Sequence, residues 1–184
     1  MNLRTLPIVD SLPDLPKVEA LYVHSFPSFE RAPFAYLVEP YPQVEFSAFY
    51  DADLFVGFVY IVTHSGISYI FYLAVAQEFR GKGYGSAILA QIRATHPSNR
   101  IILEIDDVSV KSADAPTRIR RKAFYLRNGY TENSVHIRMY GQPMEVLSQG
   151  GPITHAEYLA LWKSLMQLFS GRTAVDAYLH EMFG

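Results

Sequence analysis

Three consecutive apolar runs, each rich in Phe, Tyr, Val and Ile, place the strongest constraint on how this chain folds. They occupy residues 44–50, 54–63 and 67–75, and only three residues separate each run from the next. Aromatic and β-branched residues favour strands, and connections this short favour hairpins. The sequence therefore predicts an antiparallel meander of three strands near the middle of the chain.

A helix, a strand and a second helix follow the meander. Residues 83–95 and 115–127 read as helices, and the apolar run at residues 100–105 between them reads as a buried strand. A strand, a helix and a strand in this order favour a parallel crossover. We therefore expect the strands at 67–75 and 100–105 to be parallel neighbours.

The N-terminal segment predicts one strand and two helices. Residues 2–9 predict the strand, and Asp14 is placed to cap a helix that runs to about His24. Ser28 is placed to cap a second helix, whose length is limited by Pro33.

The C-terminal segment predicts a hairpin followed by helices. Residues 130–140 and 143–147 form the expected hairpin. Thr154 is placed to cap a helix through Phe169, and residues 174–183 predict a further helix. The whole pattern predicts an α/β (α+β) fold, in which helices cover both faces of a mixed, mostly antiparallel central sheet.

Composition narrows the classes of function. The 184 residues fit one domain, 49% of them are apolar, and the net charge is −2. A chain without excess positive charge is not expected to bind nucleic acid. No apolar stretch reaches the roughly 18–20 residues of a membrane span, and the N-terminus does not resemble a signal peptide. The chain has no cysteine, and we expect a cytoplasmic protein.

The most informative motif is a glycine-rich turn that joins an apolar strand to a helix. Unpaired N–H groups and aligned peptide dipoles make the start of a helix partly positive. Glycines let the backbone approach a phosphate closely, and two basic residues add charge. The turn is therefore a candidate diphosphate site, with a tight connection that binds nothing as the alternative. Its residues are Arg80, Gly81, Lys82, Gly83, Tyr84, Gly85 and Ser86.

Two other phosphate-binding motifs do not fit this turn. A Walker A loop needs Ser or Thr after its lysine, whereas Gly83 follows Lys82. A dinucleotide fingerprint needs a glycine at the position of Ser86 or of Ile88, depending on the glycine that starts it. The strands before the turn are also predicted to be antiparallel, unlike those of a dinucleotide-binding crossover.

Two motifs resemble those of the GNAT superfamily of N-acetyltransferases. Arg80-x-x-Gly83-x-Gly85 matches the Gln/Arg-x-x-Gly-x-Gly/Ala signature of motif A. The segment from Ala123 to Tyr130, in which a helical tyrosine precedes a Gly-Tyr pair, is similar to motif B. The order of the predicted elements is also that of this family.

The resemblance implies a single acyltransferase domain of residues 1–184, with a core of about 1–148 and a helical C-terminal extension over 149–184. A V-shaped splay would separate the two parallel central strands. Acetyl-coenzyme A would be the acyl donor, and its pantetheine arm would pair with the strand before the turn like an added strand. The residues of that strand are Leu73, Ala74 and Val75.

The resemblance also implies that an amine attacks the thioester directly. Tyr125 is expected as the general acid for the departing thiolate, with a core aromatic as the alternative. Glu104 is expected as the base that acts through water, with a solvent-facing or arginine-paired carboxylate as the alternative. Asp106 and Asp107 are the other candidate bases. Glu30 is placed to bind a cationic amine or to form a surface ion pair.

Weaker signals concern other partners. The six histidines are scattered without metal-ligand spacing, so no metal is expected. The basic cluster at residues 118–122 has the spacing of a solvated helix face. The apolar stripe of the helix at 154–169 packs on its own domain or on a second copy, so a homodimer is one of two expectations.

We therefore expect an N-acetyltransferase that moves an acetyl group from acetyl-coenzyme A to a primary amine of a small molecule. Two alternatives stay open. One is a catalytically silent acyl-coenzyme A sensor of the same fold, and the other is an N-acetyltransferase of proteins or peptides. The acceptor cleft decides between the acceptors, and the sequence does not reveal it.

Overall fold

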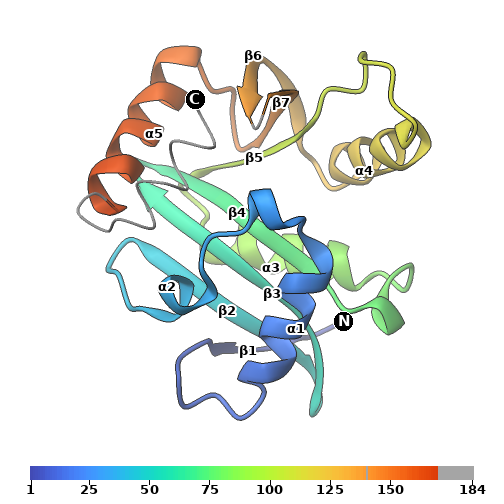
Figure 1. Cartoon of the computed structure of the whole chain (residues 1–184), viewed down its shortest axis with the longest axis vertical. Coiled ribbons are helices and arrows are strands. Elements are labelled where there is room, and N and C mark those ends of the chain that lie inside the picture. Colours follow the sequence, from blue (N-terminus) through green and yellow to red (C-terminus); the bar gives the residue numbers. More distant parts are fainter. Residues whose placement is uncertain (140, 170–184) are drawn as a thin grey trace. The chain divides into compact units, whose positions relative to one another are not determined.

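The computed structural model of the protein describes residues 1–139 and 141–169, with side chains as far as residue 166 at the C-terminal end (Figure 1). The helix expected at 174–183 lies outside the described residues. Contacts divide the chain into two compact units, one of residues 1–63 and 69–97 and the other of residues 64–68 and 98 onward. The single-domain organisation expected from the sequence stays a prediction.

The strands of the first unit follow the three apolar runs. The strand at residues 44–51 pairs antiparallel with the N-terminal strand at residues 4–7, where Arg4 lies opposite Tyr50. It also pairs antiparallel with the strand at residues 54–64, where Val44 lies opposite Val62. The predicted antiparallel pairing of the first two apolar runs is therefore confirmed. The strands are β1 (Arg4–Pro7), β2 (Val44–Asp51), β3 (Leu54–His64) and β4 (Ile67–Val75).

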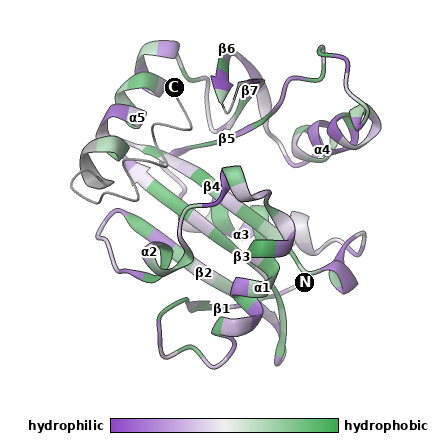
Figure 2. Ribbon diagram, in the orientation of Figure 1, coloured by the Kyte–Doolittle hydropathy of each residue, from purple (hydrophilic) through white to green (hydrophobic). Residues whose placement is uncertain are grey.

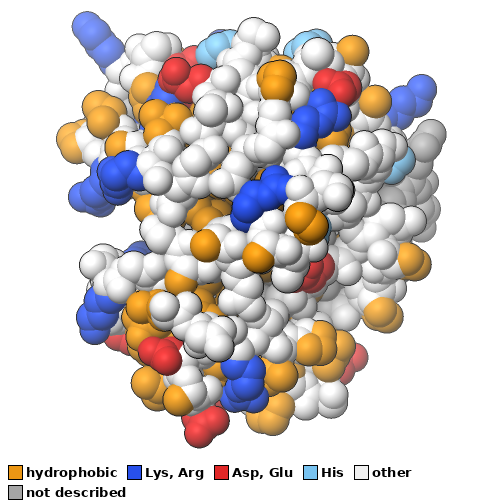
Figure 3. Space-filling view, turned by 180° about the vertical axis from the view of Figure 1, so that it is seen from behind, with side chains coloured by type: hydrophobic (Ala, Val, Ile, Leu, Met, Phe, Trp, Pro, Cys, Tyr) orange, Lys and Arg blue, Asp and Glu red, His pale blue; other side chains and the backbone are white. Residues whose placement is uncertain are grey.

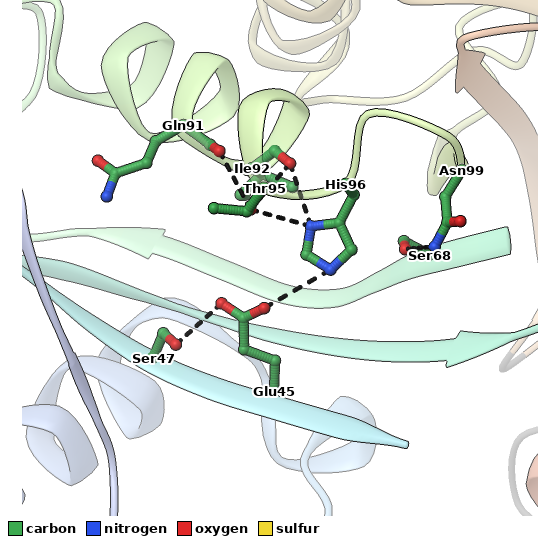
Figure 4. A network of polar contacts seen from close by, with 8 residues as sticks. All are labelled: Glu45, Ser47, Ser68, Gln91, Ile92, Thr95, His96 and Asn99. Carbon is green, nitrogen blue, oxygen red and sulfur yellow. Dashed lines mark hydrogen bonds and ion pairs between the residues drawn. The ribbon is translucent and has the colours of Figure 1, made fainter. Parts of the chain in front are cut away.

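Helices cover both faces of this part of the sheet, and neighbouring residues of β2 show why. Successive side chains of a strand point to opposite faces. The ring of Phe46 lies 6.2 Å from that of Phe34, whereas the carboxylate of Glu45 lies 3.6 Å from His96 (Figure 4). Phe34 begins one helix and His96 ends another, so the two helices lie on opposite faces. The helices of this unit are α1 (Leu15–Ser25), α2 (Phe34–Val38) and α3 (Tyr84–Thr95).

The starts of the first helices differ from the prediction. Asp14 occupies the N-cap of α1, but its side chain makes no capping hydrogen bond and instead pairs with Lys17 at 2.8 Å. Ser28 begins only a short 3-10 turn (η1, Ser28–Glu30), with Pro27 as its N-cap. Pro33 precedes α2 and so starts a helix instead of ending one, because a proline is compatible with the start of a helix.

Aromatic rings fill the space between α1, α2 and the sheet, and Figure 2 shows hydrophobic residues along the strands. The hydroxyl of Tyr72 donates to the carbonyl of Glu30 at 2.7 Å and accepts from the N–H of Ala32 at 3.1 Å. The buried Tyr22 donates to the carbonyl of Ala32 at 2.9 Å. These bonds tie the segment after η1 to β4. The rings in contact here are those of Tyr22, Phe26, Phe34, Phe46, Phe58, Tyr60 and Tyr72.

The last strand of the second unit, at residues 142–149, lies between the other two strands of the unit, a position that strand order in the sequence did not reveal. It is antiparallel to both, with Leu103 opposite Leu147 and Ile137 opposite Met144. The closing hairpin is confirmed. The elements of this unit are β5 (Arg100–Asp106), α4 (Ala115–Arg127), β6 (Thr131–Met139), β7 (Gln142–Gln149) and α5 (His155–Phe169).

Hydrogen bonds order the seven strands as β1-β2-β3-β4-β5-β7-β6, with β4 and β5 as the parallel pair. The predicted fold class, a mixed and mostly antiparallel sheet with helices on both faces, is confirmed. The V-shaped splay between the two parallel strands stays a prediction. None of the described helices is long and apolar enough to cross a membrane.

The start of α5 is held by a capping box and an ion pair. The hydroxyl of Thr154 accepts from the N–H of Glu157 at 3.2 Å, while the carboxylate of Glu157 accepts from the N–H of Thr154 at 2.9 Å. Arg100 of β5 pairs with the same carboxylate at 2.8 Å. The predicted cap is therefore confirmed, and Glu157 also connects the helix to the strand.

One face of α5 is buried, as its apolar stripe predicted. Its exposed residues include Leu159 and Met166, at 53% and 44%. The side chain of Phe169 lies outside the described part. The buried residues are Tyr158, Leu161, Trp162 and Leu165, each at most 3% exposed.

Gly57 is the residue of β3 that lets β4 pass closely. A Cβ at this position would lie 2.2 Å from the carbonyl oxygen of Ala74, which is backbone and cannot rotate away. We expect Gly57→Ala to lower the free energy of unfolding by about 2–3 kcal/mol, measured by urea denaturation. Gly66→Ala is the control, since its Cβ meets nothing within 4 Å and its left-handed backbone costs only about 1 kcal/mol. Equal losses in the two variants would contradict the close approach.

The pair between Glu157 and Arg100 predicts a pH-dependent contribution to stability. The hydrogen bond from Arg100, followed by those from Thr154, lowers the pKa of Glu157 from 4.5 to about 2. Because this pKa is lower in the folded chain, the contribution is complete above about pH 4.5 and is lost as the pH falls toward 2. Glu157→Gln should therefore be less stable than the parent at pH 7, and the difference should shrink on acidification.

The measurement is urea denaturation of both proteins across this pH range. Glu19→Gln on α1 is the control, because Glu19 is exposed and has no ion pair among the described residues. Its stability at pH 7 should equal that of the parent. A stability difference for Glu157→Gln that stays constant down to pH 2 would rule out the ion pair as its source.

Candidate functional site

The glycine-rich turn has the backbone conformation that its glycines predict. After β4 the chain makes a 3-10 turn (η2, Gln77–Phe79) and enters α3 through Gly83, the N-cap. Gly81 and Gly83 have φ angles of +73° and +89°, and a Cβ at either would meet nothing within 4 Å. A side chain is therefore disfavoured here by the left-handed backbone and not by crowding. The space over these two residues is open.

Three main-chain N–H groups at the start of α3 have no acceptor within the described chain. The first bond into the helix runs from the N–H of Ala87 to the carbonyl of Gly83 at 3.0 Å. The N–H groups of Tyr84, Gly85 and Ser86 precede this bond and make no hydrogen bond to any described residue. Such groups, with the helix dipole behind them, bind anions.

The side chain of Tyr84 anchors the helix and points away from this backbone. Its hydroxyl donates to Asp51 at the end of β2 at 2.5 Å, and its ring contacts that of Phe79 with centroids 5.1 Å apart. The hydrogen bond to Asp51 raises the pKa of the Tyr84 hydroxyl. The tyrosine therefore fixes the start of α3, and its contribution to an anion site is its N–H group.

The two basic residues of the turn differ in what they contact. Arg80 folds back, so that its Nε donates to the carbonyl of Val75 at 2.8 Å and its guanidinium approaches the hydroxyl of Ser25 at 3.5 Å. Lys82 is exposed. Arg80 therefore connects the turn to the end of β4 and to α1, while its exposed guanidinium adds positive charge beside the helix start.

The strand expected to pair with pantetheine, β4, is held in place by contacts with β3. The carbonyl of Ala74 lies over Gly57 of β3, and the N–H of Ala76 donates to Val56 at 2.8 Å. Leu73 and Val75 are half-buried, and the carbonyl of Val75 already accepts from Arg80. That Arg80 bond was not foreseen from the sequence. Pairing of this strand with pantetheine stays a prediction.

Glu30 lies in η1 of the same unit as the turn. Its carbonyl accepts the hydrogen bond from Tyr72, so its backbone is attached to β4. Arg31, its neighbour, donates to the carbonyl of Val23 at 3.5 Å. A role of the Glu30 carboxylate in binding a cationic amine stays a prediction.

Tyr125 lies in the last turns of α4, in the second unit. Its half-buried ring contacts those of Phe124 and Tyr130, with centroids 5.1 and 5.6 Å away. Its hydroxyl has no hydrogen-bond partner among the described residues. Burial raises the pKa of this hydroxyl, and the charge of Arg121 lowers it by less. The phenol therefore stays protonated at neutral pH, as a general acid must.

An ion pair that the sequence analysis missed holds α4 on the sheet. Lys122, one turn before Tyr125, pairs with the buried Glu145 of β7 at 2.7 Å and also with Glu132. The available signal was Glu145 itself, a charged residue inside an otherwise apolar strand. Because an unpaired buried carboxylate is costly, a basic partner on a covering helix was to be expected.

The expected base Glu104 contacts a side chain of the C-terminal helix. It is half-buried in β5 and accepts a hydrogen bond from Tyr158 of α5 at 2.5 Å. Neither the solvent-facing nor the arginine-paired alternative describes this contact. In the sequence Tyr158 is part of an apolar helical stripe, and this pattern gives no sign of a contact by its hydroxyl.

The two alternative bases are occupied. Asp106 pairs with Arg118 at 3.3 Å and with Arg121 at 3.1 Å. Asp107 accepts from the N–H of Ser109 at 2.8 Å, and hydrogen bonds from Ser109 lower the pKa of its carboxyl. Both carboxylates therefore have partners among the described residues.

Most of the basic cluster on α4 is also accounted for by ion pairs. Arg118, Arg121 and Lys122 each contact a carboxylate. The side chains of Arg118 and Lys122 are only 14% and 15% exposed, so the solvated helix face expected from the spacing does not describe these two residues. On the face shown in Figure 3, Lys and Arg side chains are scattered among apolar and acidic ones. Within the described residues, no group of three or more His, Asp or Glu side chains could hold a metal ion.

Comparison with known proteins gives a family for this arrangement. The family model for an acetyltransferase (GNAT) domain matches residues 43–132, which include β2–β5, the turn and α4. No curated protein matches the sequence.

Solved structures give the same fold. A GNAT-family protein from Bacteroides thetaiotaomicron has a TM-score of 0.73 at 22% identity, over 91% of this chain and 98% of that one. An acetyltransferase from Bacillus subtilis in complex with CoA has a TM-score of 0.58 at 15% identity, over 80% and 98%. An aminoglycoside 6'-N-acetyltransferase complexed with coenzyme A has a TM-score of 0.60 at 15% identity, over 79% and 96%. Residues 43–132 therefore match the acetyltransferase (GNAT) domain of the family model, and the solved structures show the same fold.

Proposed function

We propose that this protein transfers the acetyl group of acetyl-coenzyme A to a primary amine of a small molecule. The observation that carries the proposal is the group of three N–H donors at the start of α3, which have no acceptor in the described chain and directly follow the uncrowded turn at Gly81 and Gly83. A diphosphate supplies acceptors of the right charge for such donors. The solved neighbours that contain coenzyme A support the same donor.

The donor would bind through the first unit. Its diphosphate accepts from the N–H groups of Tyr84, Gly85 and Ser86, while Arg80 and Lys82 offset its charge. Its pantetheine amides pair with Leu73, Ala74 and Val75 of β4. No metal is part of this proposal.

Glu104 and Tyr125 would carry out the proton transfers. A primary alkylammonium has a pKa of about 10, so it must lose one proton before attack, and Glu104 takes that proton through water. The amine nitrogen then bonds to the thioester carbonyl carbon, the C–S bond breaks, and Tyr125 gives its proton to the sulfur. The new amide nitrogen loses its second proton, which restores the phenol. One proton passes from Glu104 to solvent in each cycle.

The acceptor class rests on fewer observations. Hydrogen bonds from Tyr22 and Tyr72 hold the backbone of the segment that contains Glu30, and this supports a role of its carboxylate in pairing with an ammonium group. Solved neighbours include the aminoglycoside enzyme and an alanine N-acetyltransferase of a ribosomal protein from Escherichia coli. The cytoplasmic location and the homodimer expected from the sequence stay predictions.

Release of free thiol from acetyl-coenzyme A tests the proposed activity. The acceptors are spermidine, an aminoglycoside, phenethylamine and, for the protein-directed alternative, a peptide with a free N-terminus. The proposal predicts thiol release with at least one small amine. Binding of acetyl-coenzyme A without release in any mixture would favour a sensor, and release with the peptide alone would favour a protein substrate.

Gly83→Asp tests the diphosphate site. The substitution places a carboxylate at the N-cap, so we expect the Kd for acetyl-coenzyme A to rise more than about tenfold by calorimetry, which corresponds to more than about 1.4 kcal/mol. Gly83→Asn is the matched control, since asparagine has the same size and tolerates the left-handed backbone without the charge. Equal affinity of the Asp and Asn variants would argue against an anion at this turn.

Tyr125→Phe tests the general acid. Removal of the hydroxyl should lower kcat by about a hundredfold, because proton transfer from a positioned side chain contributes on that scale. The Kd for acetyl-coenzyme A should stay near that of the parent. Tyr130→Phe, which removes a neighbouring phenol hydroxyl, is the control and should retain turnover. If kcat is unchanged in Tyr125→Phe, Tyr125 does not protonate the thiolate.

A further inference from the structure

A phenol from the C-terminal helix contacts the carboxylate proposed as the base. Tyr158 lies in the first turn of α5, is 1% exposed, and has its hydroxyl 2.5 Å from Oε1 of Glu104. Burial, and then the charge of Glu104, raise the pKa of this phenol far above its usual range. The hydroxyl therefore keeps its proton at every working pH, and Tyr158 is the donor in this bond.

The same strand is attached to α5 at a second point, four residues earlier. Arg100 pairs with Glu157 at 2.8 Å and donates to the carbonyl of Pro152 at 3.0 Å. Glu157 and Tyr158 are consecutive, so β5 is attached to the first turn of α5 through Arg100 and through Glu104. The phenol is therefore placed by a capped helix end and not by a mobile loop.

The rest of the helix supports this placement. Leu161, Trp162 and Leu165 follow Tyr158 on the buried face of α5, and none is more than 3% exposed. The hydroxyl of Ser164 lies 3.1 Å from Nδ1 of His64. Rotation of the helix away from β5 would expose this apolar face, which is unfavourable.

We propose that Tyr158 is a positioning residue for acetyl transfer, in which its hydroxyl holds the Glu104 carboxylate in one orientation while Glu104 accepts the proton of the amine. This inference rests on the function proposed above. The bond donated by Tyr158 stabilises the ionised carboxylate, which is the form that can take up a proton. The proton moves from the ammonium nitrogen to Glu104 through water, and Tyr158 keeps its own.

The proposal gives the C-terminal extension a role in the reaction. Tyr158 lies beyond residues 43–132, the region that matches the family model. A phenylalanine would fill the same apolar space, so the hydroxyl is the part of the side chain that packing alone does not require. Tyr158 donates to Glu104, whereas Asp106 and Asp107 at the end of β5 contact Arg118 and Ser109.

The test compares the parent with Tyr158→Phe and Glu104→Gln in two measurements. Carbon-13 NMR of the glutamate carboxyl groups gives the pH at which Glu104 titrates, and Glu104→Gln identifies its resonance. The pH dependence of kcat/KM for thiol release gives a second midpoint, the pH at which activity falls to half on the acid side of the profile. Loss of the donated bond should move both midpoints up by about one pH unit in Tyr158→Phe and should lower kcat, with the KM for acetyl-coenzyme A unchanged.

Leu165→Ala is the control for a merely structural role. It removes buried apolar contact on the same face of α5, two turns from Tyr158, and leaves the hydroxyl in place. It should lower the melting temperature without moving either midpoint. If Leu165→Ala moves the midpoints as far as Tyr158→Phe does, the effect comes from helix packing and the proposal is wrong.

The remaining outcomes separate this inference from the proposed function. Unmoved midpoints in Tyr158→Phe, with thiol release still dependent on Glu104, overturn the positioning role and leave acetyl transfer intact. Full activity of Glu104→Gln would show that Glu104 is not the base. It would overturn the inference and also leave acetyl transfer intact. If the parent releases no thiol with any amine, the proposed function fails and this inference fails with it.

Discussion

The proposed binding of acetyl-coenzyme A depends on three main-chain N–H groups at the start of α3, which have no acceptor in the described chain. Their position is set by ordinary packing: Gly81 and Gly83 supply the left-handed backbone, and Tyr84 fastens the first turn to Asp51 at the end of β2. The side chain of Tyr84 is bonded to Asp51, while the first N–H groups of α3 have no acceptor in the described chain. Such a helix start is suited to a charged ligand. The turn therefore has the character of an anion site more than of a simple connection.

The elements that follow from local sequence could be predicted well. Three strands joined by short turns, a glycine-capped helix and a helix capped by Thr154 depend on neighbours in the chain, and the structure has all of them. The turns at 52–53 and 65–66 are one residue shorter than predicted. The start of α2 at Pro33 was missed because a proline both ends and begins helices. The central place of β7 was missed because strand order in a sheet depends on tertiary contacts that hydrophobic patterns do not encode.

The candidate site was predictable only in part for the same reason. The diphosphate turn is a continuous segment, so its glycines and basic residues reveal it. The partners of Glu104 and of Lys122 are distant in sequence, and a tyrosine on an apolar helix face gives no sign that its hydroxyl meets a carboxylate. The need for a glycine at position 57 likewise follows only from the structure, where the carbonyl of Ala74 occupies the space that a Cβ would need.

The most direct measurement of the central claim is a crystal structure of the protein with acetyl-coenzyme A. We expect diphosphate oxygens at about 2.7–3.2 Å from the backbone nitrogens of Tyr84, Gly85 and Ser86. A bound coenzyme whose diphosphate lies away from these nitrogens, with the turn left empty, would contradict it.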